Sequence, residues 1–263
     1  MAGLSARSLS GLPEIRAGDD LAALIVRATD GELRDGQVLA IAHKVVSKAE
    51  GAVVALADMQ PSARARELAA EQGKDARTVQ VVLDQSREIL RASHGVLICR
   101  THHGFVCANA GVDASNAAAT SAVTGKTGAG EAGETVIVLP RNPDASARGL
   151  RARLRELTGV RVAVLVTDSF GRAWRHGQCD VALGCAGLQP LDDWRGRRDG
   201  VGRELQATWL AVADAVAAAA DLTRAKDSRE PVAIVDGLQR FVTADDGPGA
   251  CALLRPLEED LFR

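Results

Sequence analysis

Aromatic residues are scarce in this chain of 263 residues: they make up 3% of it, and tyrosine is absent. A surface that binds single-stranded nucleic acid by stacking needs aromatic side chains, so the composition argues against one. The net charge is -2, and no stretch gathers lysine and arginine into a long basic run. Non-specific binding to nucleic acid or to anionic lipid therefore has little support, and we expect small-molecule partners, with no nucleic acid and no membrane.

Paired cysteines and long apolar runs are also missing. The five cysteines are odd in number and none has CxxC spacing, so neither a disulfide framework nor a cysteine-based zinc site is expected. Residues Met1–Gly11 hold no apolar run of signal-peptide length, and Ala211–Ala220 is short and interrupted by Asp214. These absences predict a cytoplasmic protein.

The pattern along the chain predicts a mixed α/β (or α+β) fold. Apolar residues make up 46% and charged residues 25%, as in ordinary globular proteins. No linker divides residues 1–263, so we expect a single unit, which could consist of two intertwined subdomains. Residues 117–133 are rich in Ala, Thr and Gly and predict a loop. The expected helices are Asp19–Ala28, Ser62–Gln72, Asp144–Leu157 (capped by Asp144 and ended by Gly159) and Leu205–Leu222; the expected strands are Val38–Ala42, Gly95–Arg100, Gly104–Ala108, Thr135–Leu139, Val160–Thr167 and Pro231–Val235.

Two aspartates stand where ligands bind in open α/β sheets. Asp168 follows the expected strand Val160–Thr167 directly, and Asp113 lies in a run of short polar residues after another expected strand. Carboxylates on two strand-end loops could share a hard cation such as Mg²⁺ or Mn²⁺. The alternative is that each aspartate forms a turn or caps a helix, which is the commoner role for such a residue.

Basic residues follow the same strands. Lys44 and Lys48 come after Val38–Ala42, and Arg172 and Arg175 come shortly after Asp168. Such cations suit triphosphate chemistry, in which they neutralise the charge of the transferred group. The alternative for any one of them is a solvated helix face.

A P-loop-like segment and a pair of adjacent histidines do not predict the sites that such motifs usually form. Residues Thr124–Thr127 resemble the end of a phosphate-binding P-loop, but Thr120 stands where the motif requires glycine, so we interpret them as loop. The adjacent His102 and His103 fall on an expected hairpin turn, where their side chains point apart, so they are not expected to share a zinc ion.

Six blocks in order resemble one known family, the coenzyme F-420-0:L-glutamate ligases. The resemblance runs from about Leu12 to about Gly237, and six blocks in the same order are far more specific than any one. The blocks are Leu12–Ile15 with Gly18–Leu21, His43–Gly51, Ala110–Asn116, Leu139–Pro140 with Pro143–Ala147, Thr167–Arg175, and Ala211–Asp214.

The resemblance implies a family-specific α/β fold without a P-loop, a homodimer and a GTP-dependent amide ligase. In that reaction GTP phosphorylates the phospholactate carboxylate of the deazaflavin, and the amine of L-glutamate captures the acyl phosphate. Some members add further γ-linked glutamates. The family uses two divalent ions, Mg²⁺ or Mn²⁺, and often also requires K⁺.

Carried over block by block, the resemblance implies roles for individual residues. Asp113, Asp168 and Lys48 would be catalytic. The metal ligands would be Asp113, Asp168, Ser169 and Gln206. The GTP site would comprise Leu12, Pro13, Glu14, Ile15, His43, Lys48, Asn116, Glu204, Gln206 and Thr208.

Two other functions remain open at this stage. One is a metal-dependent phosphohydrolase built on Asp113 and Asp168, which would release phosphate without an amine acceptor. The other is a non-catalytic module that presents the deazaflavin to a reductase, although the retained carboxylates count against it. Residues Val242–Gly247 and Leu254–Pro256 also resemble the end of the ligase part of bifunctional relatives that continue into a nitroreductase-like domain.

Overall fold

The structure is a computed structural model that describes residues 3–113 and 134–260. Helices and strands are intermixed along the chain, and the strands form several sheets, which confirms the predicted mixed α/β class. The helices are α1 (Leu21–Ala28), α2 (His43–Ala49), α3 (Ala63–Gln72), α4 (Ala76–Asp84), α5 (Pro143–Thr158) and α6 (Val212–Asp221). The strands are β1 (Ser5–Leu9), β2 (Val38–Ala42), β3 (Val53–Ala55), β4 (Ser86–Ser93), β5 (Val96–Thr101), β6 (Val106–Ala108), β7 (Thr135–Ile137), β8 (Ala163–Arg172), β9 (Arg175–Ala186), β10 (Leu191–Asp193), β11 (Trp209–Ala211) and β12 (Val232–Asp236).

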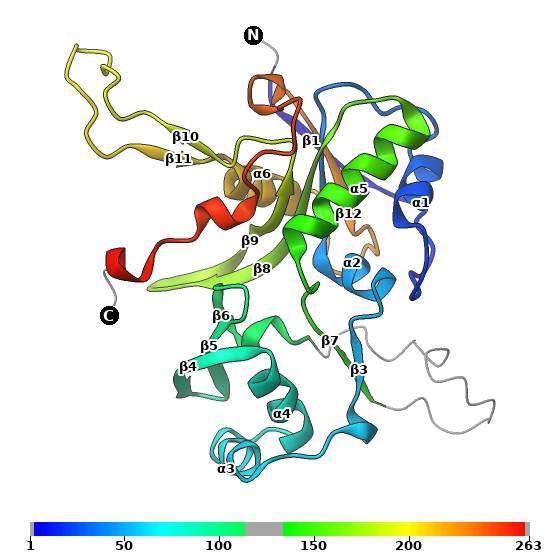
Figure 1. Cartoon of the computed structure of the whole chain (residues 1–263), viewed down its shortest axis with the longest axis vertical. Helices are drawn as coiled ribbons and strands as arrows, with labels where there is room; N and C mark the ends of the chain where they lie inside the picture. The colour runs from blue at the N-terminus through cyan, green and yellow to red at the C-terminus, as the bar shows by residue number, and fades with distance from the viewer. Residues whose placement is uncertain (1–2, 114–133, 261–263) are drawn as a thin grey trace.

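A five-stranded sheet in the order β1-β12-β2-β8-β9 forms the centre of the body (Figure 1). Only β2 and β8 run parallel, and the other neighbours in this sheet are antiparallel. The apolar runs of β2, β8 and β12 explain their central place, because a strand covered on both faces has no polar side to present to water.

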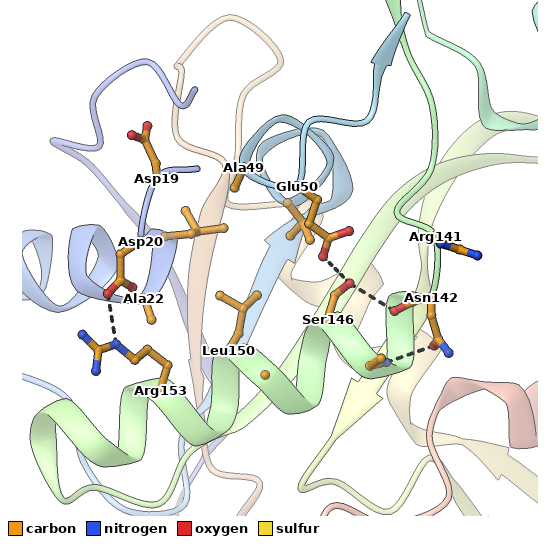
Figure 2. A pocket seen from close by; sticks show the side chains of 14 residues that line it. Asp19, Asp20, Ala22, Ala49, Glu50, Arg141, Asn142, Ser146, Leu150 and Arg153 are labelled. Atoms are coloured by element: carbon orange, nitrogen blue, oxygen red, sulfur yellow. Dashed lines mark hydrogen bonds and ion pairs between the residues drawn. The ribbon is translucent and has the colours of Figure 1, made fainter. Parts of the chain in front are cut away.

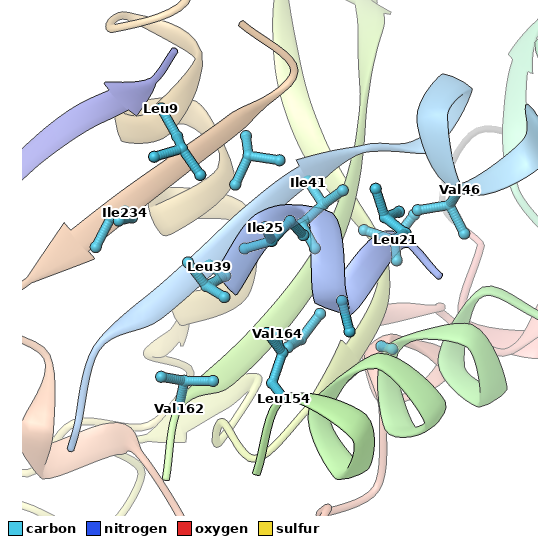
Figure 3. Packing of buried hydrophobic residues seen from close by; sticks show 14 of the residues in the cluster. Leu9, Leu21, Ile25, Leu39, Ile41, Val46, Leu154, Val162, Val164 and Ile234 are labelled. Atoms are coloured by element: carbon cyan, nitrogen blue, oxygen red, sulfur yellow. The ribbon is translucent and has the colours of Figure 1, made fainter. Parts of the chain in front are cut away.

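Alternate residues of these strands enter two separate cores. Leu39 and Ile41 of β2 pack with α1 and α5 on one face of the sheet (Figure 3), whereas Val38 and Ala40 pack with α6 on the other. The period of two follows from the pleat of a strand, and it fixes which helices can cover which face.

A second lobe is built from the chain between β3 and β7. Strands β4, β5 and β6 form their own sheet, which packs against α3 and α4 through a core that includes Leu68, Val82 and Leu97. The antiparallel pair β3–β7 connects this lobe to the body (Figure 1). The expectation of one unit with two intertwined subdomains remains a prediction.

Several expected elements are confirmed with small shifts of their ends. Helix α1 begins after Asp20, which caps it by accepting a hydrogen bond from the Ala23 amide, and α5 ends at Gly159 in the left-handed conformation. The strand expected over 160–167 is buried from Ala163 to Thr167.

Three expectations are wrong. Asp144 does not cap α5: Asn142 does, while the Asp144 carboxylate accepts hydrogen bonds from the amides of Cys185 and Ala250. The helix expected over Leu205–Leu222 begins only at Val212, because Trp209–Ala211 pairs with Leu191–Asp193 as a strand.

The third correction concerns Asp168, which does not follow its strand but lies inside it. Strand β8 continues to Arg172 because β9, which the apolar pattern did not predict, pairs with it as a long hairpin. Within the described residues, no helix has the length and apolarity needed to cross a membrane.

Candidate active site

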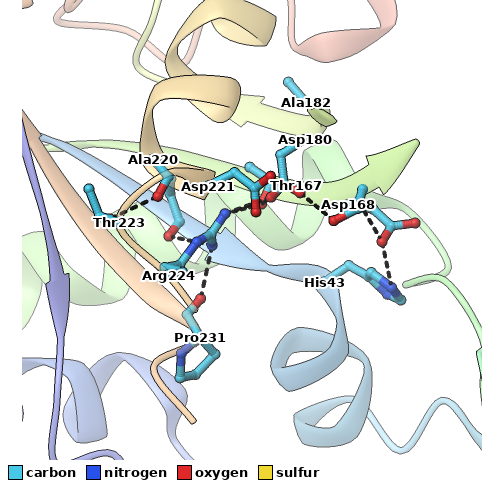
Figure 4. A network of polar contacts seen from close by, with 12 residues as sticks. His43, Thr167, Asp168, Asp180, Ala182, Ala220, Asp221, Thr223, Arg224 and Pro231 are labelled. Atoms are coloured by element: carbon cyan, nitrogen blue, oxygen red, sulfur yellow. Dashed lines mark hydrogen bonds and ion pairs between the residues drawn. The ribbon is translucent and has the colours of Figure 1, made fainter. Parts of the chain in front are cut away.

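Parallel pairing of β2 and β8 brings a histidine and an aspartate together. Ala42 pairs with Thr167, so the next residues of the two strands, His43 and Asp168, lie side by side. His43 Nε2 is 3.4 Å from Asp168 Oδ1, and the His43 side chain is only 2% exposed (Figure 4). His43 is also the first residue of α2, so the sheet and the helix together fix its ring.

The buried His43 ring is only partly satisfied by its neighbours. Its Nδ1 lies 3.4 Å from the hydroxyl of Ser47, one turn later in α2. Its Nε2 faces Asp168 but makes no hydrogen bond, because the contact lacks the required geometry. A buried nitrogen without a hydrogen bond is uncommon in folded proteins and is typical of sites that bind a further group.

Asp113 pairs with Lys44, the residue of α2 that follows His43. Lys44 Nζ lies 2.6 Å from Asp113 Oδ2. The backbone of Asp113 exchanges two hydrogen bonds with Ile137 of β7, which holds the carboxylate in position. Adjacent residues at the amino end of α2 therefore each face one of the two predicted aspartates.

Lys48 connects α2 with the segment Leu12–Ile15. Its ammonium lies 2.5 Å from Glu14 Oε1, and its side chain is 9% exposed. Ile15 is buried in the core beneath α1, which fixes the segment beside α2. A solvated helix face is therefore the wrong interpretation of Lys48, because a lysine is rarely this buried without a paired charge.

A buried network that sequence patterns did not reveal lies behind Asp168. Asp180 of β9 accepts hydrogen bonds from Thr167 Oγ1 (2.9 Å), Ser169 Oγ (2.6 Å) and Arg224 Nη2 (2.6 Å). Figure 4 shows Arg224 reaching from the end of α6 to Asp180, with the carbonyl of Pro231 on its other side. Asp180 was missed because its strand was not predicted; an isolated acid within Arg175–Ala186 was its only signal.

Cys107 of β6 lies close enough to Asp168 to respond to its charge. Burial, followed by the negative charge of Asp168, raises the pKa of the Cys107 thiol to about 12. Cys107 is thus held as a neutral thiol close to the acidic centre, which fits a structural role rather than that of a nucleophile.

The remaining predicted residues do not join this group within the described chain. Glu204, Gln206 and Thr208 lie on the segment between β10 and β11, which projects from the body away from α2 (Figure 1). Asn116, the loop 117–133 and the P-loop-like Thr124–Thr127 lie outside the described residues. Arg172 turns back to the carbonyl of His176 and stabilises the β8–β9 hairpin.

The described cavity lies elsewhere, at the carboxyl end of α2. It has a volume of about 680 Å³ and is lined by α1, α2 and α5 (Figure 2). Two pairs of its polar side chains bind each other: Ser146 Oγ donates to Glu50 Oε1 at 2.5 Å, and Arg153 donates to Asp20 at 3.0 Å. The contacts of His43 and Lys44 with the two predicted aspartates lie at the opposite, amino end of α2, and none of these four residues lines the cavity.

Taken together, the junction of β2, β8 and α2 carries acidic and basic side chains at the edge of a central sheet, which is where open α/β sheets of enzymes bind their ligands. Residues 11–237 match the family model of the F420-0:gamma-glutamyl ligases. The chain belongs to this family.

Relatives similar to this chain along their whole length carry one shared name, coenzyme F420:L-glutamate ligase. The protein of Methanopyrus kandleri is 44% identical and covers 100% of both chains. That of Methanothermobacter thermautotrophicus is 42% identical over 99% of each chain, and that of Archaeoglobus fulgidus is 40% identical over 97% of this chain and 94% of its own.

Proposed function

We propose that this chain is a GTP-dependent amide ligase that adds L-glutamate to the phospholactate tail of coenzyme F-420-0. One set of contacts carries the proposal in a chain of this family. At the amino end of α2, His43 faces Asp168 and Lys44 pairs with Asp113. In the last turn of the same helix, Lys48 pairs with Glu14. A carboxylate is a poor nucleophile towards a triphosphate until the negative charge of the triphosphate is neutralised, and these bases, with a cation held by the aspartates, would neutralise it.

The reaction proceeds in two balanced steps. A lactyl carboxylate oxygen attacks the γ-phosphorus of GTP, the bond to the β-phosphate oxygen breaks, and GDP leaves. The glutamate amine then attacks the acyl carbon, phosphate leaves, and the amine loses a proton as the amide forms. Further γ-linked glutamates would be added by repeating both steps on the new terminal carboxylate.

The bases of α2 fit the first step. Lys48 approaches Leu12–Ile15, the segment we assign to GTP together with Asn116, so its ammonium would meet the phosphates. His43 is fixed between Ser47 and Asp168 and would orient that carboxylate. Glu14 would exchange its hold on Lys48 for the nucleotide, because its side chain is 56% exposed and loses little on release.

The donors present fit a hard divalent cation. The carboxylates of Asp113 and Asp168 and the hydroxyl of Ser169 are oxygen ligands of the kind that Mg²⁺ and Mn²⁺ prefer, and His43 Nε2 is a buried atom without a hydrogen bond. No group of three or more His, Cys, Asp or Glu side chains is arranged as metal ligands in the described part of the chain. The cation would therefore complete its shell with phosphate oxygens and water, and when bound it would neutralise the transferred phosphoryl group. We expect two such ions, with K⁺ as a further activator.

A homodimer would explain the position of the predicted residues on the arm, defined here as β10, β11 and residues 194–208. This arm projects away from α2 (Figure 1), and it exposes Val201 (81%), Trp209 (49%) and Leu210 (42%). Exposed apolar side chains on a projecting element are typical of protein contacts. A second copy could receive the arm and bring Gln206 to its site.

Phosphate release tests the proposed reaction. Purified chain with F-420-0, GTP and Mn²⁺ should release phosphate only when L-glutamate is added, and ATP should support a lower rate than GTP. Phosphate released at full rate without L-glutamate would instead establish a phosphohydrolase. Equal rates with the two nucleotides would remove the assignment of GTP.

A further inference from the structure

Two bases on the loop after α6, Arg224 and Lys226, reach the same strand in different ways. The Arg224 side chain is 7% exposed and binds Asp180, Thr167 and the carbonyl of Pro231. The Lys226 side chain is 70% exposed and donates to Ser169 Oγ at 2.8 Å and to Asp221 Oδ1 at 3.0 Å. The first contact is enclosed by protein, whereas the second is open to exchange.

The hydroxyl of Ser169 makes two hydrogen bonds and has one lone pair that neither of them uses. A serine hydroxyl has one proton to donate and two lone pairs that accept. The proton goes to Asp180 Oδ1, 2.6 Å away, and Arg224 holds that carboxylate in place through its other oxygen. Both lone pairs therefore point away from Asp180, and one of them accepts from Lys226.

A divalent cation on Ser169 would meet the Lys226 ammonium at close range. Two cations bound to one oxygen repel each other strongly, and the screening by water at this exposed position weakens but does not remove the repulsion. The ion pair of an exposed lysine is weak, so it yields to a doubly charged ion. Asp221 can retain the displaced ammonium beside the site.

We propose that Lys226 is an exchangeable cation of this site, which shares Ser169 Oγ with the divalent ion and leaves it when that ion binds, while the Arg224–Asp180 pair holds the hydroxyl in place throughout. This inference rests on the proposed metal role of Ser169. Lys226 is then a positioning residue that lowers the affinity for the ion. The contact between the loop after α6 and Ser169 would be present only when the ion is absent.

Binding of Mn²⁺ to the full chain, measured by the electron paramagnetic resonance signal of the free ion, tests this without turnover. Lys226→Met should tighten Mn²⁺ binding about fivefold, the scale of one exposed ion pair. Lys226→Arg should stay near the parent value because the charge remains. Lys74→Met, which removes a lysine from the lobe of α3 and α4, should change nothing.

A double-mutant cycle isolates the shared oxygen. Ser169→Ala should weaken Mn²⁺ binding, and in that background Lys226→Met should lose its effect. An equal effect of Lys226→Met with and without Ser169 would overturn the proposal, as would no effect at all. If Ser169→Ala leaves Mn²⁺ affinity unchanged, both the proposal and the metal role of Ser169 fall, while the phosphate-release assay still tests the ligase reaction by itself. Arg224 is left intact, because its loss would strand Asp180 as a buried charge.

Discussion

The two ends of α2 are both polar, but they differ in how their groups are satisfied. At the amino end, His43 and Lys44 face Asp168 and Asp113, and His43 Nε2 lacks a hydrogen bond. At the carboxyl end, Glu50 is held by Ser146 beside a cavity of about 680 Å³. The comparison shows why we propose the chemistry at the amino end: paired charges and a buried atom without a hydrogen bond point to a binding site more directly than an open volume does.

The largest expected effect comes from the aspartates of the amino end. Asp113→Asn and Asp168→Asn should each lower turnover more than about a hundredfold, because each removes a carboxylate that would hold the divalent cation, and that cation would neutralise the negative charge of the transferred phosphoryl group. Both residues are partly exposed and outside the apolar cores, so the thermal midpoint should change little. Product formation and a melting curve on the same samples check this. Normal turnover in either variant would remove that aspartate from the site.

Lys48 should give the next largest effect. Lys48→Ala should lower kcat by about a hundredfold, the scale for one preorganised stabilising group, with a smaller loss of GTP affinity. Lys48→Arg should restore activity only in part, since a planar guanidinium replaces a compact ammonium poorly at a phosphate. For each variant, kcat and the GTP dissociation constant are measured separately and their losses compared. A silent Lys48→Ala would return this residue to a structural role with Glu14.

The thiol of Cys107 should report on the charge of Asp168. Since burial and then Asp168 raise its pKa to about 12, only about one molecule in ten thousand carries the thiolate at pH 8, and labelling should be slow in the native fold. Asp168→Asn should lower this pKa and speed labelling by roughly threefold. Mass spectrometry of peptides after timed alkylation follows Cys107 apart from the exposed Cys251. An unchanged rate would contradict the influence of the Asp168 side chain on this thiol.

The smallest effect is expected at the carboxyl end of α2. Ser146→Ala and Glu50→Gln remove one exposed hydrogen bond and should leave turnover within about twofold of the parent chain. Steady-state kinetics in parallel with Asp168→Asn provide the matched comparison. A loss as large as that of Asp168→Asn would move the substrate site into the cavity.

The central sheet could be predicted because its strands carry uninterrupted apolar runs. Val38–Ile41 and Ala163–Thr167 are buried, and Asp113 and Asp168 could be singled out by their positions along the chain. The contact of Asp168 with His43 depends on the parallel register of β2 and β8, and that of Asp113 with Lys44 on the pairing of Asp113 with β7, which no local pattern encodes.

The parts that escaped prediction have weaker local signals. Strand β9 begins with the polar residues Arg175–Gln178, so its pairing with β8 and the inward position of Asp180 were hidden. The segment Trp209–Ala211 has helical composition yet forms a strand, because its partner Leu191–Asp193 outweighs local propensity. Roles assigned to Gln206 and Asn116 remain predictions.

Incubation with F-420-0, GTP, Mn²⁺ and L-glutamate, with the product mass as readout, tests the central claim most directly. The parent chain and Glu50→Gln should both form the glutamyl amide together with GDP and phosphate, and Asp168→Asn should form none. Amide formation by Asp168→Asn at the parent rate, or its loss in Glu50→Gln alone, would contradict the assignment of the chemistry to the amino end of α2.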